Sequence, residues 1–503
     1  MSWLPVASWL LPGVCGLGLW LVPRGKARRI AGARLSAIAQ LSLSLILQRA
    51  TATGEVLVQG LGDWPSPFGI VFAADRLSGL FVVLQSLLLA IAVWALRPEA
   101  HGEGTVDRAL PLLFLLSCGL NAAFLTGDLF NLFVAFELVL LASYLLIQVP
   151  GSERSLRAAF PNVAVNLLAS LFFFVAIALL YGQHGTVNLA DLARHLGEGG
   201  SPMLTSVAGG LLAAAFGIKA GLVPLLFWLP ATYPTLAGPV AALFAGMMTK
   251  LGVFALLRTV PLLMSGTPVP DVLVWIGSAS ALIGVLAALS EAELRRLLGF
   301  HIVSQVGYMV LGLGLLTVGA VAAAIFYLTH HIVVKATLFL VADELERRNG
   351  TRDLQSMRGD RAWAGGLAVV FLLAAFSLAG LPPFSGFFAK VGLFRATLGS
   401  ASWWSLAVLA VASLFTLASM LKIWGVAFRV SKTAAASVGN RPDAAADTRP
   451  VWLLVAVSFG LALAAGPVYE FAEETARQVL DSAAYIEAVL SAGADTAPAE
   501  AGS

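Results

Sequence analysis

Several ionisable side chains lie inside long apolar stretches of this sequence, where a charge is costly. A lysine or aspartate at the centre of a lipid bilayer costs about 2.5–3.5 kcal/mol, and a glutamate should cost a comparable amount. Such side chains face the interior of a helix bundle or a hydrated cavity, where they find partners. Acting together, groups of this kind could hand protons from one to the next. The candidates are Glu137, Lys219, Lys250, His331, Lys335 and Lys390.

The segment IFYLTHHIVVKATLFL places His331 and Lys335 four residues apart, so that they share one face of a helix. Because histidine titrates near neutral pH, an imidazole beside an ammonium group predicts a proton relay. The alternative is that His331 is a core histidine whose hydrogen bonds are satisfied. His330 points to another side of the same helix and is the weaker candidate.

Two of the lysines lie beside predicted breaks in their helices. Lys219 stands in AAAFGIKAGLVPLLFWLP and Lys390 ends LAGLPPFSGFFAK, and glycines and prolines interrupt both segments. Interrupted helices mark ion sites in transporters, because the freed backbone groups and helix ends bind charge. Glu137 and Lys250 instead lie near the middle of their apolar runs. For Glu137 the alternative role is an ion pair that only holds two helices together.

The composition requires a membrane. Hydrophobic residues make up 59% of the 503 positions and charged residues 12%, whereas a soluble globular chain carries about 25% charged residues. A span across the bilayer core needs about 20 apolar residues. We therefore predict an all-α, polytopic membrane protein of about fourteen transmembrane helices. They are expected at 3–22, 30–48, 77–96, 109–126, 128–149, 158–182, 202–226, 237–260, 272–290, 299–316, 318–342, 364–396, 403–428 and 450–468.

The two predicted breaks suggest an internal repeat. They fall in the seventh and twelfth helices. Because this offset of five helices is an odd number, the second repeat would be inverted in the membrane relative to the first. Equivalent breaks in two halves are typical of inverted repeats. The expected parts are an N-terminal three-helix segment (1–108), a first repeat of helices 4–8 (109–260), a second repeat of helices 9–13 (272–430), and a C-terminal part with a flexible cytoplasmic loop, a last helix and an outer acidic tail (431–503).

Lysine and arginine positions predict the orientation, because positive residues accumulate in cytoplasmic loops. With the N-terminus outside, twenty of the 31 fall inside, six fall outside and five lie within predicted spans. The C-terminus is then outside as well. Residues 470–490 are expected to form a short acidic amphipathic helix on the outer face, followed by a disordered tail at 491–503.

The sequence offers no cofactor site. Cys15 and Cys118 form no CxxC pair, which argues against a disulfide framework, an iron–sulfur centre or a zinc site. The glycines of LGLGLLTVG follow no strand and imply no dinucleotide site. We expect no cofactor, no metal and no nucleic-acid partner.

Five segments carry a resemblance to a known family. They are TGDLFNLFVAFE, KAGLVPLLFWLPATYP, HIVSQVGYM, HIVVKATLFL and LAGLPPFSGFFAK. From about 60 to about 430 the chain resembles the antiporter-like subunits shared by Mrp-type multisubunit Na+/H+ antiporters, respiratory complex I and membrane-bound hydrogenases. Within this family the stretch 61–80 is similar to the D-type subunits of the Mrp branch.

The resemblance implies roles for the candidate residues. Glu137 would pair with Lys219, Lys250 would relay charge toward the centre, and Lys390 would be the terminal proton carrier. His331 and Lys335 would continue the path between them. Many relatives have a second histidine one turn before His331, where this chain has Tyr327. The central relay is therefore expected to run through water or through His330.

The resemblance also implies a setting. The chain would be a non-enzymatic, proton-translocating subunit in a bacterial inner membrane, bound to other membrane subunits and acting on protons and Na+. A second interpretation is a proton-pumping membrane subunit of an NADH:quinone oxidoreductase or a membrane-bound hydrogenase. A third is a structural scaffold whose ion pairs only hold helices together.

Overall fold

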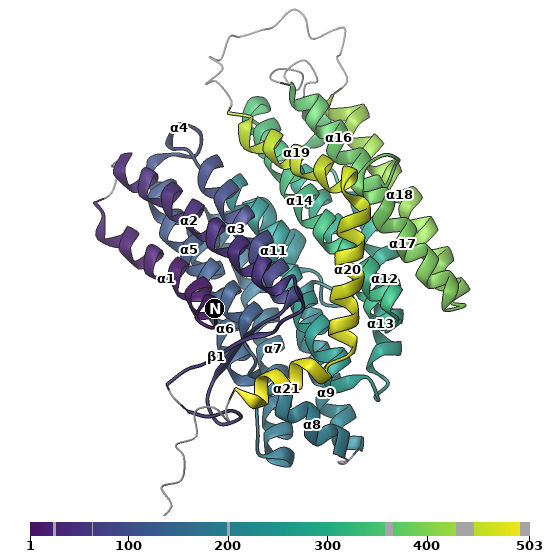
Figure 1. Ribbon diagram of the computed structural model, residues 1–503. Coiled ribbons are helices and arrows are strands. Elements are labelled where there is room, and N and C mark those ends of the chain that lie inside the picture. Colours follow the sequence, from purple (N-terminus) through teal and green to yellow (C-terminus); the bar gives the residue numbers. More distant parts are fainter. Residues whose placement is uncertain (24–26, 63, 199–201, 358–365, 429–446, 493–503) are drawn as a thin grey trace, which may run out of the picture.

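The computed structural model describes residues 1–23, 27–62, 64–198, 202–357, 366–428 and 447–492. These residues form a bundle of helices that mostly run between two ends of the molecule (Figure 1). In its N-terminal part the elements are α1 (Leu4–Leu21), α2 (Ala27–Thr51), β1 (Leu57–Gly60), β2 (Val71–Ala74), α3 (Arg76–Ala95), α4 (Pro98–His101), α5 (Glu103–Leu125), α6 (Leu129–Gln148), α7 (Glu153–His184) and α8 (Leu189–Glu198).

The second part of the chain continues the bundle and ends in a bent C-terminal pair of helices. Its elements are α9 (Pro202–Ala220), α10 (Trp228–Thr232), η1 (Tyr233–Thr235), α11 (Gly238–Thr259), η2 (Val260–Met264), α12 (Val269–Ser290), α13 (Leu294–Gly314), α14 (Val318–Asn349), η3 (Leu354–Ser356), α16 (Leu367–Ala379), α17 (Ser385–Gly399), α18 (Trp403–Ala427), α19 (Arg449–Leu463), α20 (Ala465–Leu480) and α21 (Ala483–Ser491).

The predicted polytopic helical architecture is confirmed. Among the described residues, twelve helices are long and apolar enough to cross a membrane, and α19 with α20 would make a thirteenth. These twelve correspond to the first eleven predicted helices and the thirteenth. The remaining two predictions, 364–396 and 450–468, fall on the broken pairs α16–α17 and α19–α20.

Both predicted breaks are present, and both begin at a glycine. Helix α9 ends before Gly221 and α16 ends before Gly380, and each glycine has a left-handed backbone, with φ of 76° and 83°. Only glycine adopts this conformation without steric cost, so the helices stop there. The shared geometry agrees with two related halves, although the inverted repeat and the predicted domain boundaries stay predictions.

The C-terminal part differs from the expected arrangement. Helix α19 stops at Leu463, and α20 leaves it at an angle of 79°. Helix α20 then packs along α14 and α3 instead of beginning at 470 as a separate surface helix. The short outer element is α21, which lies beside α8 (Figure 1). The predicted flexible loop at 431–449 and the tail lie almost entirely outside the described residues.

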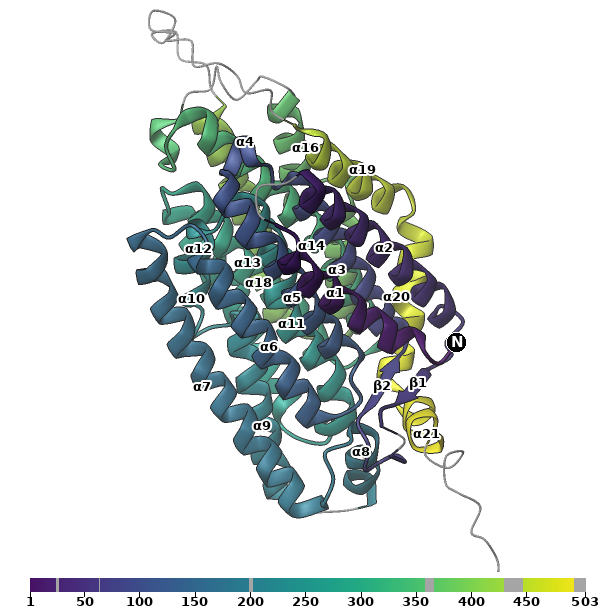
Figure 2. The same ribbon diagram turned by 90° about the vertical axis from the view of Figure 1, so that its left-hand side faces the viewer.

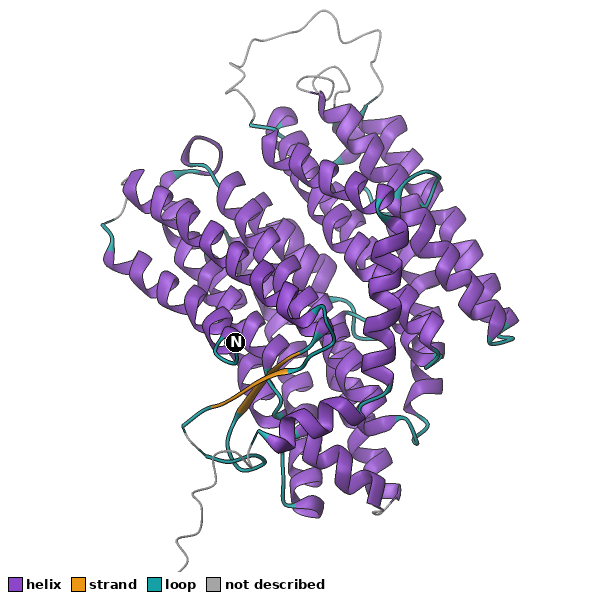
Figure 3. Cartoon of the chain, viewed as in Figure 1, coloured by secondary structure: helices purple, strands orange, loops and turns teal. Residues whose placement is uncertain are grey.

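A short antiparallel hairpin of β1 and β2 is the part of the described chain that an all-α prediction misses (Figure 3). The hairpin, α8 and α21 share one end of the molecule, which we call the α8 end (Figure 1). The short helix α4 and the last turns of α14 lie at the other end, the α4 end. Helices α1 and α2 lie over α5 and α3 on the side shown in Figure 2.

Two helices form the centre of the bundle and carry three of the candidate residues. The apolar windows of α11 and α14 are buried along their whole length. Lys250 lies on α11, and His331 and Lys335 lie on α14. The two helices pack against each other, so the fold brings these three side chains toward one central zone.

Candidate functional site

Glu137 and Lys219 are linked through a third residue. The Ser170 hydroxyl on α7 donates a 2.5 Å hydrogen bond to Glu137 Oε1, and Lys219 Nζ donates to Ser170 Oγ at 3.3 Å. The Lys219 ammonium group also lies 5.2 Å from the ring centroid of Phe136, within cation–π range. Lys219 is 4% exposed, whereas Glu137 is only partly buried. Glu137 and Lys219 are therefore connected through Ser170, in a three-residue link across α6, α7 and α9.

The break after α9 connects this link with α11. A Cβ on Gly252 would lie 2.6 Å from the backbone nitrogen of Ala220, so glycine allows the two helices to touch. A Cβ on Gly221 would meet Thr249 Cγ2 at 3.6 Å, which places the residue before Lys250 against the break. The indole nitrogen of Trp228 donates to the Ile218 carbonyl oxygen at 3.0 Å and satisfies a backbone group freed there.

The central lysines rest on backbone carbonyl groups. Lys250 Nζ donates to the Ala245 oxygen at 2.7 Å, and Lys335 Nζ donates to the Leu298 oxygen at 3.2 Å. Both lysines are fully buried and lie within electrostatic range of each other. His331 lies within electrostatic range of both lysines. Neither of its ring nitrogens has a hydrogen-bond partner among the described residues.

Lys390 lies at the second helix break. It belongs to α17, and its Nζ donates 2.9 Å back to the carbonyl oxygen of Ala379, the last residue of α16. A cation at a helix C-terminus is favoured by the helix dipole. The ammonium group also lies 5.6 Å from the ring centroid of Tyr308. Lys219 precedes its break and Lys390 follows its own, so the two lysines approach the breaks from opposite sides.

His330, the weaker candidate on α14, has a defined polar environment. Its Nδ1 shares a 2.8 Å hydrogen bond with the Ser385 hydroxyl at the start of α17, and it lies within electrostatic range of Lys390. A Cβ on Gly386 would lie 2.9 Å from His330 Nε2, so the glycine allows α17 to approach α14. This geometry favours His330 as the group between α14 and the terminal lysine.

Tyr327 joins a buried polar cluster with α13. Its hydroxyl donates to Gln305 Oε1, and its ring stacks on that of Tyr308 at 5.3 Å. His301, one turn before Gln305, shares a 2.8 Å hydrogen bond with Ser419 and lies within electrostatic range of Lys335 and Lys390. The structure thus provides polar groups on α13 at the place where the expected second histidine is absent.

The six predicted residues therefore lie on helices that pack one against the next, from the partly buried Glu137 on α6 to the buried Lys390 on α17. No salt bridge joins any of the four lysines in this series to a carboxylate in the part of the chain that the structure describes. Sequence reasoning missed Ser170, His301 and Ser385. His301 stood inside the segment HIVSQVGYM but near the predicted start of its helix, whereas α13 begins at Leu294 and buries it.

Three further charged residues, at the ends of helices, have structural partners. Asp75 and Asp128 cap α3 and α6 by accepting hydrogen bonds from the backbone nitrogens of Ser78 and Asn131. Lys422 donates to the carbonyl oxygens of Leu289 and Glu291 at the end of α12, at 2.7 and 2.8 Å. Within the described ranges, no group of three or more His, Cys, Asp or Glu side chains could hold a metal ion.

Comparisons with known proteins show the family of this chain. Residues 126–416 match the family described as "NADH:quinone oxidoreductase/Mrp antiporter, TM". The chain is 37% identical to the D-type subunit of the Na(+)/H(+) antiporter of Alkalihalophilus pseudofirmus, over 97% of this chain and all of the relative. It is 32% identical to the corresponding subunit of Bacillus subtilis, over 92% of this chain and 94% of the relative.

Solved structures show the same fold. A chain of the Mrp complex from Dietzia sp. is 33% identical, with a TM-score of 0.87 over 97% of this chain and 99% of its own. A chain of Thermus thermophilus respiratory complex I is 25% identical, with a TM-score of 0.80 over 95% of this chain and 99% of its own. The chain therefore belongs to the NADH:quinone oxidoreductase/Mrp antiporter transmembrane family, within its branch of D-type subunits of Mrp Na+/H+ antiporters.

Proposed function

We propose that Glu137, Lys219, Lys250, His331, Lys335 and Lys390 form a proton relay across the middle of the membrane in a multisubunit Na+/H+ antiporter. The observation that carries this proposal is the buried series itself. Each group lies near the next through a hydrogen bond, an intervening helix contact or an electrostatic interaction. A set used only to hold helices together would instead place each lysine against a carboxylate.

The relay works by moving charge along the series. A carboxylate that withdraws from an ammonium group weakens the attraction that holds the proton there, and its return restores that attraction. Ser170 can transmit this change, because its hydroxyl contacts both Glu137 and Lys219. A change in charge at Lys219 then acts on Lys250 and Lys335 through Coulomb interaction at reduced dielectric.

The far end of the series delivers the proton through α17. His331 and His330 are adjacent residues on α14. His330 contacts Ser385, the first residue of the helix that carries Lys390. Tyr327 ionises poorly, so its role is to hold Gln305 and not to carry the proton itself. The route around this tyrosine runs through His330, with His301 of α13 as a parallel branch.

The proposal includes an orientation and partners. The excess of lysine and arginine in the loops at the α4 end favours a cytoplasmic position for that end, with both termini outside. Other membrane subunits of the antiporter would surround the chain and complete the exchange of protons for Na+. Glu137 is only partly buried within this chain, which favours a partner subunit that covers it in the complex.

Antiport by the complete complex tests the proposal. The whole operon is expressed in an antiporter-deficient strain, and Na+-dependent proton movement is followed in everted vesicles. Glu137→Ala and Lys219→Ala should abolish antiport while the complex still assembles. Normal antiport in both variants would favour the scaffold interpretation.

The likeness to complex I favours one second candidate, a proton-pumping membrane subunit of a redox complex. The same relay residues would serve either function. Genes that flank this one distinguish the two: small membrane subunits indicate an antiporter, whereas iron–sulfur and flavin subunits indicate a redox complex.

A further inference from the structure

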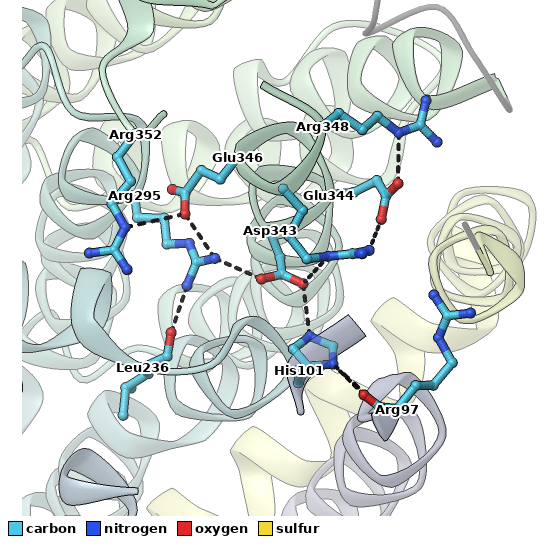
Figure 4. A network of polar contacts seen from close by, with 10 residues as sticks. Arg97, His101, Leu236, Arg295, Asp343, Glu344, Glu346, Arg348 and Arg352 are labelled. Carbon is cyan, nitrogen blue, oxygen red and sulfur yellow. Dashed lines mark hydrogen bonds and ion pairs between the residues drawn. The ribbon is translucent and has the colours of Figure 1, made fainter. Parts of the chain in front are cut away.

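A cavity at the α4 end is lined by the last turns of α14, the helix that carries His331 and Lys335. Its volume is about 540 Å³, and it is lined by α4, the α13 start and the last turns of α14. Figure 4 shows the network of charged groups that surrounds it. His101 Nε2 lies 3.1 Å from Asp343 Oδ2, and Arg295 Nη2 lies 2.8 Å from Asp343 Oδ1 and 2.9 Å from Glu346 Oε2.

The arginines at this cavity are already paired. Arg295 also donates 2.7 Å to the Leu236 carbonyl oxygen, Arg154 is paired with Glu293 at 2.6 Å, and Arg352 lies 3.7 Å from Glu346. The cavity is therefore poorly suited to an anion. By contrast, Glu346 is 7% exposed, and its Oε1 has no hydrogen-bond partner among the described residues. The Nε of Arg295 is also left without one in that part of the chain.

The cavity is large enough for several water molecules. A space lined by the Glu346 carboxylate and the His101–Asp343 pair suits the exchange of protons with the aqueous phase.

The same elements lead from the cavity to the relay. Asp343 follows Lys335 by eight residues on α14, about 12 Å along the helix. Helix α13 also connects the cavity with Lys335. Arg295 contacts Asp343, and the carbonyl oxygen of Leu298, about one turn later on α13, accepts a hydrogen bond from Lys335. Asp343 also presses against the first residue of α11, since a Cβ on Gly238 would overlap its carboxyl carbon. Helix α11 carries Lys250.

We infer that this cavity is the port through which protons pass between the cytoplasm and Lys335, with Glu346 and the His101–Asp343 pair as the exchanging groups. The inference rests on the proposed relay. The charged groups that face Glu346 and influence its titration are Arg295, Arg352, Asp343 and Glu293. Those that face Asp343 are His101, Arg295 and Arg347. The buried apolar residues between the port and Lys335, including Phe339, keep the two separate in this structure.

Substitutions that remove a titratable group test the port in the complete complex. Glu346→Gln and His101→Gln should lower the antiport rate at least tenfold at neutral pH, with part of the rate regained as the pH is lowered. The control is Glu344→Gln, since Glu344 is ion-paired on the same helix but does not line the cavity. Lys335→Ala is measured alongside. If Lys335→Ala abolishes antiport while both port variants keep the wild-type rate and pH profile, the port is wrong and the relay stands. If Lys335→Ala retains antiport, the relay itself fails.

A chemical block gives a second test that does not depend on removing a charge. Thr351 lines the cavity, whereas Gln355 is exposed on the same loop and lies outside it. Each is replaced by cysteine after Cys15→Ala and Cys118→Ala. A bulky, membrane-impermeant thiol reagent added to everted vesicles should reduce antiport at least tenfold in Thr351→Cys and less than twofold in Gln355→Cys. Full labelling of Thr351→Cys without loss of rate contradicts the port.

Discussion

Glu137 and Lys219 are joined by the hydroxyl group of Ser170, which donates to the carboxylate at 2.5 Å and accepts from the ammonium group at 3.3 Å. The carboxylate and the ammonium group form no direct salt bridge in this structure. A hydroxyl between two charged groups can rotate and contact either one, so it couples their movements without locking them together. The link therefore suits a pair that opens and closes as protons move.

Removing this hydroxyl should weaken the coupling. Hydrogen bonds to charged groups contribute about 1.5–3 kcal/mol, so Ser170→Ala should lower the antiport rate by roughly tenfold or more. Ser170→Thr keeps a hydroxyl and should retain most of the rate. Both rates are measured in everted vesicles that contain equal amounts of assembled complex. Equal rates for Ser170→Ala and the wild type would show that the serine is only a packing residue.

The contact of α17 with α14 predicts a strong effect on folding. In Gly386→Ala the new Cβ would overlap the Ser377 carbonyl oxygen and lie 2.9 Å from His330 Nε2, so the helices must separate. We expect loss of assembled complex, measured by affinity purification with a tagged partner subunit. Gly399→Ala, whose Cβ meets nothing within 4 Å, is the control and should assemble normally.

His301 should be required although sequence reasoning passed it over. It is buried beside Ser419, and it lies within electrostatic range of Lys335 and Lys390. His301→Ala should lower antiport at least tenfold if the branch through α13 carries protons. Ser419→Ala removes only the hydrogen-bond partner and should have a smaller effect. The reverse order of the two effects would assign His301 a structural role.

The charged pair at the α8 end predicts a pH dependence of stability. Arg258 donates two hydrogen bonds, of 2.7 and 2.8 Å, to the Asp75 carboxylate. Burial raises the pKa of Asp75, but the Arg258 charge and the hydrogen bonds outweigh it, so the pKa lies below the ordinary value of 3.8. The pair should therefore stabilise the fold fully above about pH 4 and lose this contribution as the pH falls further.

Substitution tests the same pair at neutral pH. Asp75→Asn leaves the buried Arg258 without its counter-charge and should cost about 3–5 kcal/mol, seen as a lower Tm of the purified complex. Glu153→Gln breaks an exposed pair with Arg157 and should cost less than about 1 kcal/mol. A Tm for Asp75→Asn as high as that of Glu153→Gln would mean that the buried pair contributes little.

The candidate relay residues stand out in the sequence because each is an ionisable side chain in an apolar run. Lys250 and Lys335 stand out in this way, and the breaks beside Lys219 and Lys390 follow from glycine and proline. Ser170 does not stand out, because serine is common in membrane helices and often bonds to its own backbone. Its role depends on two other helices, which no local pattern reveals.

The port could not be predicted for a related reason. Helix α14 continues to Asn349, whereas its apolar pattern ends near 342, so Asp343 and Glu346 looked like loop charges. Their environment comes from Arg295 and His101, which are distant in the sequence. Charged residues at helix ends are common in sequences. Only the tertiary packing shows whether they form a buried network around a cavity or ordinary ion pairs on the surface.

The most direct test of the relay compares two lysines of the second half in the same assay. Lys335 is fully buried within electrostatic range of Lys250 and His331, whereas Lys422 caps the end of α12 outside the series. In everted vesicles that contain the assembled complex, Lys335→Ala should abolish Na+/H+ antiport and Lys422→Ala should leave it within about twofold of the wild type. Antiport that persists in Lys335→Ala, with the complex fully assembled, would contradict a proton relay through the centre of this chain.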